Sequence, residues 1–330
     1  MSPAAQPAIS VVFVTAQNDD ATLRRMLERL AGQTVRHRME VIIVAQEGVP
    51  VELGDPGCAG FWAVRLARCA QQALFGTALA IGVRQANAAF VALIEDHCTP
   101  DPGWAEALLA RHAEGYAVVG SEISNANPDS SLSWSNFVLT HSRWAPPAVA
   151  GEVEAVAGDN CSYRCDALLE VGDELDALLE SGSVLHRQLR DAGHRIFLEP
   201  RAKLVHVTPS RFTSYIGSFF HSGRLFAALW SRHWPWTRRA WHAAAAPLIA
   251  LRWVADLLPA VRSQAVGQRV LPVRLLMLAA VPAISCGYLL GYLFGAGSSP
   301  RYTSDIYFRR ATHIRAKDRA ALESTGASGS

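Results

Sequence analysis

The sequence predicts an α/β domain built on a mostly parallel sheet, followed by helices that contact a membrane. From Ile9 to about Glu122, short β-branched runs alternate with stretches of helical periodicity, which is typical of βαβ units. In addition, 50% of the 330 residues are hydrophobic and the mean hydropathy is +0.12, which is more apolar than one soluble domain requires. We therefore expect a Rossmann-like domain joined to membrane segments.

The elements of the α/β domain follow from hydrophobic periodicity. The first helix has Leu23, Met26, Leu27 and Leu30 at positions i, i+3, i+4 and i+7, and it begins at Asp19 or Asp20. The expected strands are 9–14, 41–44, 61–66, 90–94 and 117–120, and helices are expected over 71–85 and 104–113. A second block, 158–206, is expected to hold helices near 166–171 and 183–192 and strands around 196 and 204.

Charge and cysteine usage exclude several classes of protein. The formal net charge of +2 provides no global basic field, so nucleic acid is not an expected partner. The six cysteines form no paired CxxC framework, which argues against a structural zinc site or a disulfide scaffold and favours a reducing compartment. No basic region precedes the apolar run 9–14, so we expect a first strand there rather than a cleaved signal peptide.

The most informative stretch is the apolar strand 90–94 and the polar residues that follow it. Glu95, Asp96 and His97 place two carboxylates and an imidazole at the carboxyl edge of the sheet, where open α/β folds bind ligands. They are candidate ligands for a divalent ion that holds a diphosphate. Alternatively, the acids only end the strand and cap the next helix. Because several residues separate them from Trp104, where that helix begins, we favour the site.

The character of the chain changes after Pro209. Residues 212–236 have aromatic side chains at helical spacing with arginines nearby, so we expect an amphipathic helix lying on a membrane; a surface helix that closes the core is the alternative. Five of nine tryptophans group in and after this segment, as is typical of a bilayer interface: Trp230, Trp234, Trp236, Trp241 and Trp253.

Residues 237–300 are expected to form the membrane segment. Residues 275–297 supply enough uncharged residues to span the hydrocarbon core. Residues 240–261 form a second span or a helix resting in the interface, because Arg252 and Asp256 interrupt them. The remaining residues, 301–330, read as a polar tail that is disordered at its end.

Taken together, the segments over residues 9–230 resemble the family 2 glycosyltransferases with a GT-A fold, whose domain would cover 1–211. Pro102-Gly103-Trp104 matches the tripeptide that commonly follows the family's Asp-x-Asp motif, and Glu95-Asp96-His97 stands in the place of that motif. Gln33-Thr34, with the strand that follows it, and Gly158-Asp159-Asn160, with the Tyr163-Arg164 pair, are similar to two further family segments.

Besides His97 in the place of the last aspartate of the motif, the sequence departs from the family pattern at two further places. Where the family carries Asp-Asp-Gly-Ser to hold the nucleotide, this chain has Ala45-Gln46-Glu47-Gly48. Where an acid pair is usual, Glu180 is followed by Ser181. A catalytically degenerate, membrane-anchored GT-A domain that acts as a binding or scaffold subunit is therefore the alternative to an enzyme. A soluble nucleotide-binding oxidoreductase is set aside, because the first strand lacks a Gly-rich turn after it.

The resemblance implies transfer of a sugar from a nucleotide-diphosphate donor, UDP- or GDP-linked, to an acceptor hydroxyl, with inversion and with a divalent metal, Mn preferred over Mg. The implied metal ligands are Asp96, His97 and His206, and the implied general base is Glu180 or Asp159. The implied nucleotide-sugar residues are Thr15, Gln46, Glu47, Glu95 and Asp96, and the implied acceptor-side residues are Trp104, Asn160, Tyr163 and Arg164. Residues 121–147 are expected to be an acceptor-facing insertion.

The membrane segments imply the remaining partners. We expect contact with membrane lipids and a lipid-linked or envelope acceptor, because anchoring at a bilayer raises encounters with substrates confined there. The expected location is the inner (cytoplasmic) membrane, with the catalytic domain on the cytoplasmic side.

Overall fold

The computed structural model describes residues 6–15, 20–51, 53, 58–264 and 266–323. The chain forms two compact units, each treated separately below. The first comprises the described residues up to Ser124 together with 147–205, and the second comprises 125–146 and the described residues from 206 onward.

One half of the sheet in the first unit is parallel. Strands β1 (Ile9–Thr15), β2 (Met39–Gln46), β3 (Ala63–Cys69) and β4 (Phe90–Leu93) lie in the order β3-β2-β1-β4 with parallel pairings. All of β1 and nearly all of β2 are buried, as expected for strands covered on both faces. The predicted α/β fold with its four leading strands is confirmed.

The other half of the sheet is mixed. The whole sheet has nine strands among the described residues. Strand β8 (Cys161–Arg164) pairs antiparallel with both β4 and β6 (Val118–Asn125). Beyond β6 lie β9 (Ile196–His206) and β5 (Cys98–Pro100), and β7 (Gly151–Glu152) pairs antiparallel with β9. The two strands expected near residues 196 and 204 are one continuous strand, β9.

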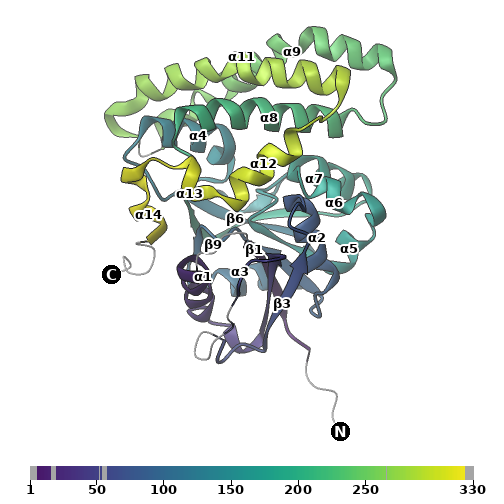
Figure 1. Ribbon diagram of the computed structural model, residues 1–330, viewed down its shortest axis with the longest axis vertical. Coiled ribbons are helices and arrows are strands. Elements are labelled where there is room, and N and C mark those ends of the chain that lie inside the picture. The colour runs from purple at the N-terminus through teal and green to yellow at the C-terminus, as the bar shows by residue number, and fades with distance from the viewer. Residues whose placement is uncertain (1–5, 16–19, 52, 54–57, 265, 324–330) are drawn as a thin grey trace. The chain divides into compact units, whose positions relative to one another are not determined.

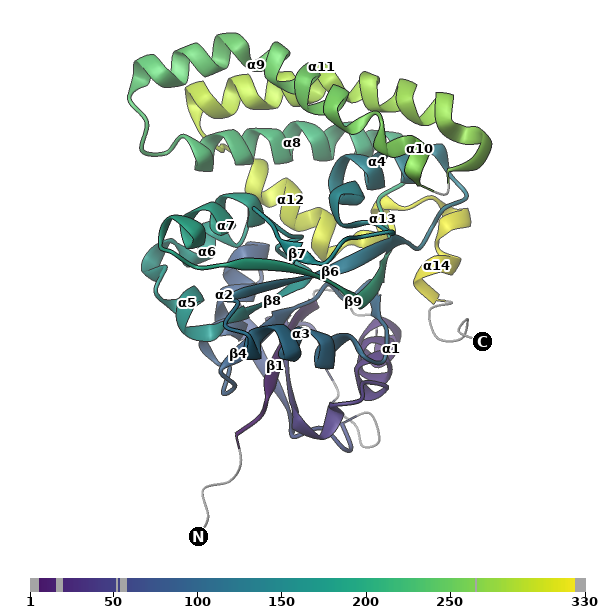
Figure 2. The same cartoon turned by 180° about the vertical axis from the view of Figure 1, so that it is seen from behind.

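Helices flank this sheet (Figures 1 and 2). They are α1 (Asp20–Ala31), α2 (Phe75–Arg84), α3 (Trp104–Ala113), α5 (Cys165–Leu169), α6 (Leu175–Leu178) and α7 (Gly182–Asp191), with short 3-10 turns at Arg36–Arg38 and Gly172–Glu174. Helix α2 packs directly on β1, since a Cβ atom at Gly82 would collide with the side chain of Val12. Its glycine is therefore what permits the close approach of helix and sheet.

The second unit is helical. It contains α4 (Ser131–His141), α8 (Phe212–Trp230), α9 (Trp236–Leu257), α10 (Ala260–Ser263), α11 (Val270–Phe294), α12 (Ser299–Phe308), α13 (Arg310–His313) and α14 (Ala320–Glu323), with 3-10 turns at Ser142–Trp144, Gly267–Arg269 and Ala316–Asp318. Helices α8, α9 and α11 lie side by side in both views (Figures 1 and 2). Gly287 and Gly291 of α11 lie against the backbone of Phe220 and Arg224 of α8.

Two helical segments of the second unit are long and apolar enough to cross a membrane, Trp236–Ser263 and Gly267–Phe294. They overlap the expected spans, 240–261 and 275–297. Helix α8 covers most of the expected interface helix, 212–236, and α12 to α14 cover much of the expected tail, 301–330, whose last seven residues lie outside the described part. The two segments are candidate membrane spans.

Candidate functional site

The predicted donor-side residues lie at one edge of the sheet. Because β1, β2 and β4 are parallel, their carboxyl ends meet there, and Thr15 and Gln46 are the last residues of β1 and β2. Thr15 is buried, whereas Glu47 is exposed in the turn after β2. That turn is fixed to β3, since Glu47 N–H donates to the carbonyl of Cys69 at 2.8 Å.

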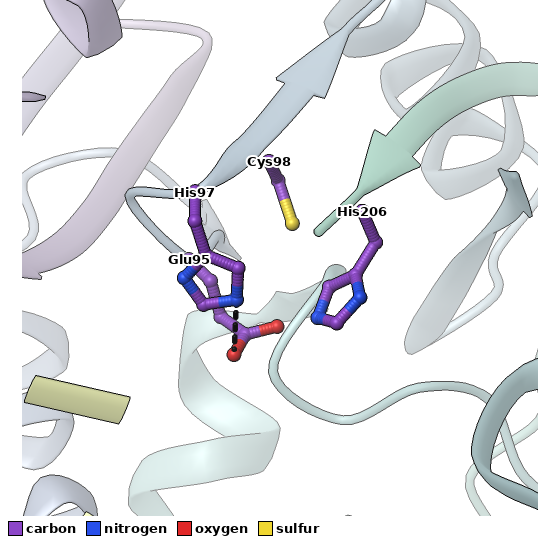
Figure 3. A group of neighbouring side chains, drawn as sticks. All are labelled: Glu95, His97, Cys98 and His206. Atoms are coloured by element: carbon purple, nitrogen blue, oxygen red, sulfur yellow. Dashed lines mark ion pairs between the residues drawn. The ribbon is translucent and has the colours of Figure 1, made fainter. Parts of the chain in front are cut away.

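Four side chains with metal-binding atoms meet just beyond the end of β4 (Figure 3). They are Glu95, His97, Cys98 and His206, and one ligand atom from each lies within 4.8 Å of all the others. Each residue is at most 3% exposed. His206 is the last residue of β9, so the strand that runs through the sheet sets its backbone position. The predicted pair His97 and His206 is thus brought together.

Asp96 has a different place from its two neighbours. Its Oδ1 atom lies 3.1 Å from Nδ1 of His97, while Nε2 of His97 lies 3.1 Å from Oε1 of Glu95. One ring nitrogen of His97 therefore faces the cluster and the other faces a carboxylate that orients the ring. In this arrangement Glu95 belongs to the cluster and Asp96 supports it; direct ligation by Asp96 stays a prediction.

The side chain of Asn160 is hydrogen-bonded to the turn formed by residues 95–98. Its Nδ2 atom donates to Oε2 of Glu95 at 2.5 Å, and its Oδ1 atom accepts from the Glu95 amide at 3.3 Å and from the Cys98 thiol at 3.1 Å. Asn160 is fully buried and directly precedes β8, whose first residue, Cys161, pairs with Leu93 at the end of β4. The pairing of β4 with β8 therefore places the side-chain amide of Asn160 next to Glu95 and Cys98.

Arg29 of α1 fixes the same turn from another side. Its Nη1 atom donates to the carbonyl of Cys98 at 3.0 Å and to that of Asp96 at 3.5 Å. Burial lowers the pKa of Arg29 from its usual value, and the neighbouring Cys98 opposes this shift. Sequence reasoning missed Arg29 as a site residue, since an arginine on an amphipathic helix reads as solvated surface.

Sequence reasoning also missed Cys98 as a ligand. The residue stands next to His97, but a thiol directly after a histidine is not a metal motif by itself. Cys98 joins the cluster because the chain turns between β4 and β5, and Cys98 is the first residue of β5. The N–H of Cys98 donates to the carbonyl of Glu95 at 3.0 Å and closes this turn. The signal that existed was its place between the acidic motif and a proline-rich turn.

The two predicted general bases lie on segments that touch. A Cβ atom on Gly158 would lie 2.6 Å from Cα of Gly182, so Gly158, which precedes Asp159, and the start of α7 are in direct contact. Glu180 precedes that start by two residues, and its Oε1 atom accepts from the N–H of Gly76, in the first turn of α2, at 2.5 Å. Since α2 follows β3, this end of α2 lies at the carboxyl edge.

The predicted acceptor-side residues are mostly buried. Trp104 is fully buried and its Nε1 donates to Ser121 Oγ at 2.9 Å. Tyr163 is also fully buried; its hydroxyl donates to the carbonyl of Gly158 at 2.9 Å and lies 2.9 Å from Nε2 of His186. Both side chains are therefore part of the protein core, and contact with an acceptor stays a prediction for them.

Arg164 differs from the other acceptor-side residues because it is only partly buried. It forms an ion pair with Asp166 at 2.6 Å, and hydrogen bonding to that carboxylate raises the pKa of Arg164. Its guanidinium is therefore already occupied by an acid two residues away. Replacement of this partner by an anionic substrate stays a prediction.

Residues 11–168 match the family described as Glycosyl transferase family 2. No curated protein matches the chain. Similar solved structures include S. aureus TarS, at 14% identity and a TM-score of 0.45, covering 86% of this chain and 55% of that one. They also include GalNAc-T7 with UDP, GalNAc and Mn2+, at 14% identity and a TM-score of 0.49, covering 68% of this chain and 50% of that one. The chain spans about half the length of these proteins.

Proposed function

Because the chain belongs to glycosyl transferase family 2 over residues 11–168, we propose that it transfers a sugar from a nucleotide-diphosphate donor to an acceptor hydroxyl, with inversion. The acceptor oxygen forms a bond to the anomeric carbon as the bond from that carbon to the diphosphate breaks, and a carboxylate takes the hydroxyl proton. The cluster at the carboxyl edge of the parallel strands carries this proposal.

A divalent ion fits this cluster by its chemistry, since two imidazoles, a thiol and a carboxylate converge on one buried point. Glu95, His97, Cys98 and His206 would hold it. When bound there, the ion would neutralise charge on the departing diphosphate. The chain's own residues keep the donors in place: Asp96 orients His97, and Asn160 orients Glu95.

Glu180 and Asp159 are the proposed general bases, and only one of them takes the acceptor proton. The Oε1 atom of Glu180 accepts the hydrogen bond from the Gly76 amide, which fixes the position of this carboxyl group. Asp159 lies next to Asn160, which contacts the metal-binding turn, and is half-buried. Both carboxylates stand on the segments joined by the Gly158–Gly182 contact.

We propose that the acceptor is lipid-linked and that the helical unit enters the cytoplasmic membrane with the catalytic domain on the cytoplasmic side. Helices α9 and α11 expose large apolar side chains to solvent, among them Trp241 (73%), Leu248 (71%) and Leu271 (66%). An apolar groove of about 500 Å³ lies along α8 and α11. Its lining includes Ile216, Phe220, Pro282, Ala283 and Cys286. A groove of this character suits the hydrocarbon chain of a lipid.

Calorimetric titration with UDP and with GDP, followed by a transfer assay with the matching nucleotide sugars, tests the donor proposal. Binding of one nucleotide and turnover of its sugar would support it. Failure of a folded protein to bind either nucleotide would instead favour the scaffold alternative, in which the missing acids after β2 have abolished donor binding.

Membrane insertion has a separate test. Cys286 is exposed and lies on α11, within the segment that would cross the bilayer. In proteoliposomes, a membrane-impermeant maleimide should leave this thiol unlabelled while a lipid-soluble maleimide labels it. Rapid labelling by the impermeant reagent in intact vesicles would contradict insertion of α11.

A further inference from the structure

Two imidazoles, one thiol and one carboxylate form the cluster at the end of β4, and we infer that it retains a zinc-class transition metal with the Cys98 thiolate as a protein ligand. This inference concerns the identity and retention of the ion. It rests on the cluster alone, so the transfer reaction can fail while the inference stands.

The donor set selects the class of ion. Magnesium prefers oxygen ligands in octahedral geometry and keeps several waters, and manganese favours carboxylate and water. Thiolate and imidazole ligands suit zinc, cobalt and iron, and two nitrogens, one sulfur and one oxygen match the ligand types of zinc sites. The sequence-based preference for manganese took Asp96 and two histidines as ligands. With Cys98 in the cluster and Asp96 outside it, the preference moves to zinc.

The spacing of the donors agrees with a four-coordinate ion. Metal–ligand distances of about 2.0–2.3 Å in a tetrahedral site place the ligand atoms about 3.3–3.8 Å apart. The four atoms already lie within 4.8 Å of one another, and His97 Nε2 is 3.1 Å from Glu95 Oε1 (Figure 3). Small side-chain adjustments therefore close the site around an ion.

The surrounding hydrogen bonds have the pattern found around metal ligands. A ligating histidine commonly gives its second ring N–H to a carboxylate, as Nδ1 of His97 can do toward Asp96 at 3.1 Å. A ligating carboxylate is itself hydrogen-bonded, as Oε2 of Glu95 is by Asn160. On binding, the Cys98 thiol loses its proton to solvent and its sulfur exchanges the bond to Asn160 for the ion.

Burial explains why the ion is retained. The four donors are 0–3% exposed, and all four would bind the ion. An ion held in this way dissociates slowly, and zinc can still expand to five-coordinate when the diphosphate lies beside it. The missing CxxC pairs are no obstacle, because β4, β5 and β9 bring the donors together from distant parts of the sequence.

Metal analysis of the full chain tests the inference. Protein purified in detergent, with its affinity tag removed and no metal added, should contain close to one zinc-class ion per chain by mass spectrometry. Cys98→Ser should weaken zinc binding at least tenfold in a chelator competition. Cys165→Ser is the matched control, because Cys165 is also buried but lies outside the cluster, and it should bind zinc like the wild type.

Cobalt substitution gives a second reading that does not depend on a mutant folding. Cobalt in the wild-type protein should show the near-ultraviolet charge-transfer band of thiolate ligation, the Cys165→Ser protein should keep it, and a folded Cys98→Ser protein should lose it. Absence of this band in folded, cobalt-loaded wild type would overturn the inference, as would equal zinc affinity of wild type and Cys98→Ser. Nucleotide titration of the same samples reports separately on donor binding.

Discussion

The side-chain amide of Asn160 is hydrogen-bonded to the carboxylate of Glu95, with 2.5 Å between Nδ2 and Oε2, and both residues are buried. A hydrogen bond to a buried charge is costly to remove, because the carboxylate is left unsatisfied. Asn160→Ala should therefore lower the free energy of unfolding by about 1–3 kcal/mol and weaken metal binding.

Urea denaturation and chelator competition measure these two effects. Ser10→Ala provides the control: Ser10 is also buried, and its hydroxyl donates to the buried carboxylate of Glu40 at 2.5 Å, near the amino ends of β1 and β2. That variant should lose stability and keep its metal affinity. If Asn160→Ala bound metal as tightly as the wild type, Asn160 would have no part in holding Glu95 for an ion.

Asp96→Asn tests the orientation of His97. The amide keeps the shape of the side chain but removes the charge that lies 3.1 Å from Nδ1. Loss of such a second contact weakens metal binding by about 10–100-fold, and competition with a chromophoric chelator measures this. Complete loss of binding would instead indicate that Asp96 is a direct ligand, as the sequence predicted.

Glu180→Gln and Asp159→Asn distinguish the two proposed general bases. Glutamine can still accept the Gly76 amide hydrogen bond through its carbonyl oxygen, so α2 keeps its cap while the base is lost. The variant that removes the base should lower kcat by about 10²–10⁴-fold and leave nucleotide affinity unchanged.

Asp176→Asn is the control for this pair, since Asp176 lies on the neighbouring helix α6 and pairs with Arg84 in a partly exposed ion pair. It should retain full activity. Equal activity of all three variants would place the base elsewhere.

Gly287→Leu should destabilise the helical unit. A Cβ atom at this position would collide with the carbonyl oxygen of Phe220, which is backbone and cannot rotate away. Overpacking of this kind costs about 1–3 kcal/mol, and thermal unfolding in detergent should show a lowered Tm. Ala283→Leu lies one turn away on α11 and faces the open apolar groove, so its Tm should stay near that of the wild type. A destabilised Ala283→Leu protein would contradict the open groove.

Because His112 and His186 are buried, we expect the free energy of unfolding to fall at acidic pH. Burial lowers the pKa of His112 to about 4 and that of His186 to about 3. Both are depressed below the unfolded value of about 6.5, so the unfolded chain binds more protons between these values. Their contribution to stability is complete above about pH 6.5 and is lost as the pH falls toward 4 and then 3.

Each group contributes a slope of about 1.4 kcal/mol per pH unit in that range. Urea denaturation at pH 7 and pH 5 measures it. His112→Gln should reduce the slope, because glutamine does not titrate, whereas an unchanged slope would exclude His112 as a source. His37 is exposed and serves as the control position. The free energy of unfolding of His37→Gln should depend on pH as that of the wild type does.

Sequence alone predicted the parts of this protein that depend on local pattern. The strand 90–94 is continuous and apolar and ends in acids, so its place at the carboxyl edge follows from periodicity. The cluster is different: the family resemblance implied His206 at the end of β9 as a ligand, whereas Cys98, which enters through a turn, was missed. Nothing in the pattern near Glu180 reveals its bond to Gly76, 104 residues away. Contacts that depend on how distant segments pack were the ones missed.

Helices α9 and α11 differ in the length of their uncharged, apolar stretch and so in the thickness of hydrocarbon that each can span. Between Ala240 and Leu251, α9 has 12 residues without Asp, Glu, Lys or Arg, about 18 Å of helix, whereas Leu275–Phe294 of α11 has 20, about 30 Å. The ion pair of Arg252 and Asp256, at 2.9 Å and largely exposed, ends the apolar part of α9. When both helices insert, the apolar part of α9 spans less of the hydrocarbon core than that of α11. This mismatch favours thin or locally deformed bilayers, so lipid chain length should affect which membrane region this protein occupies.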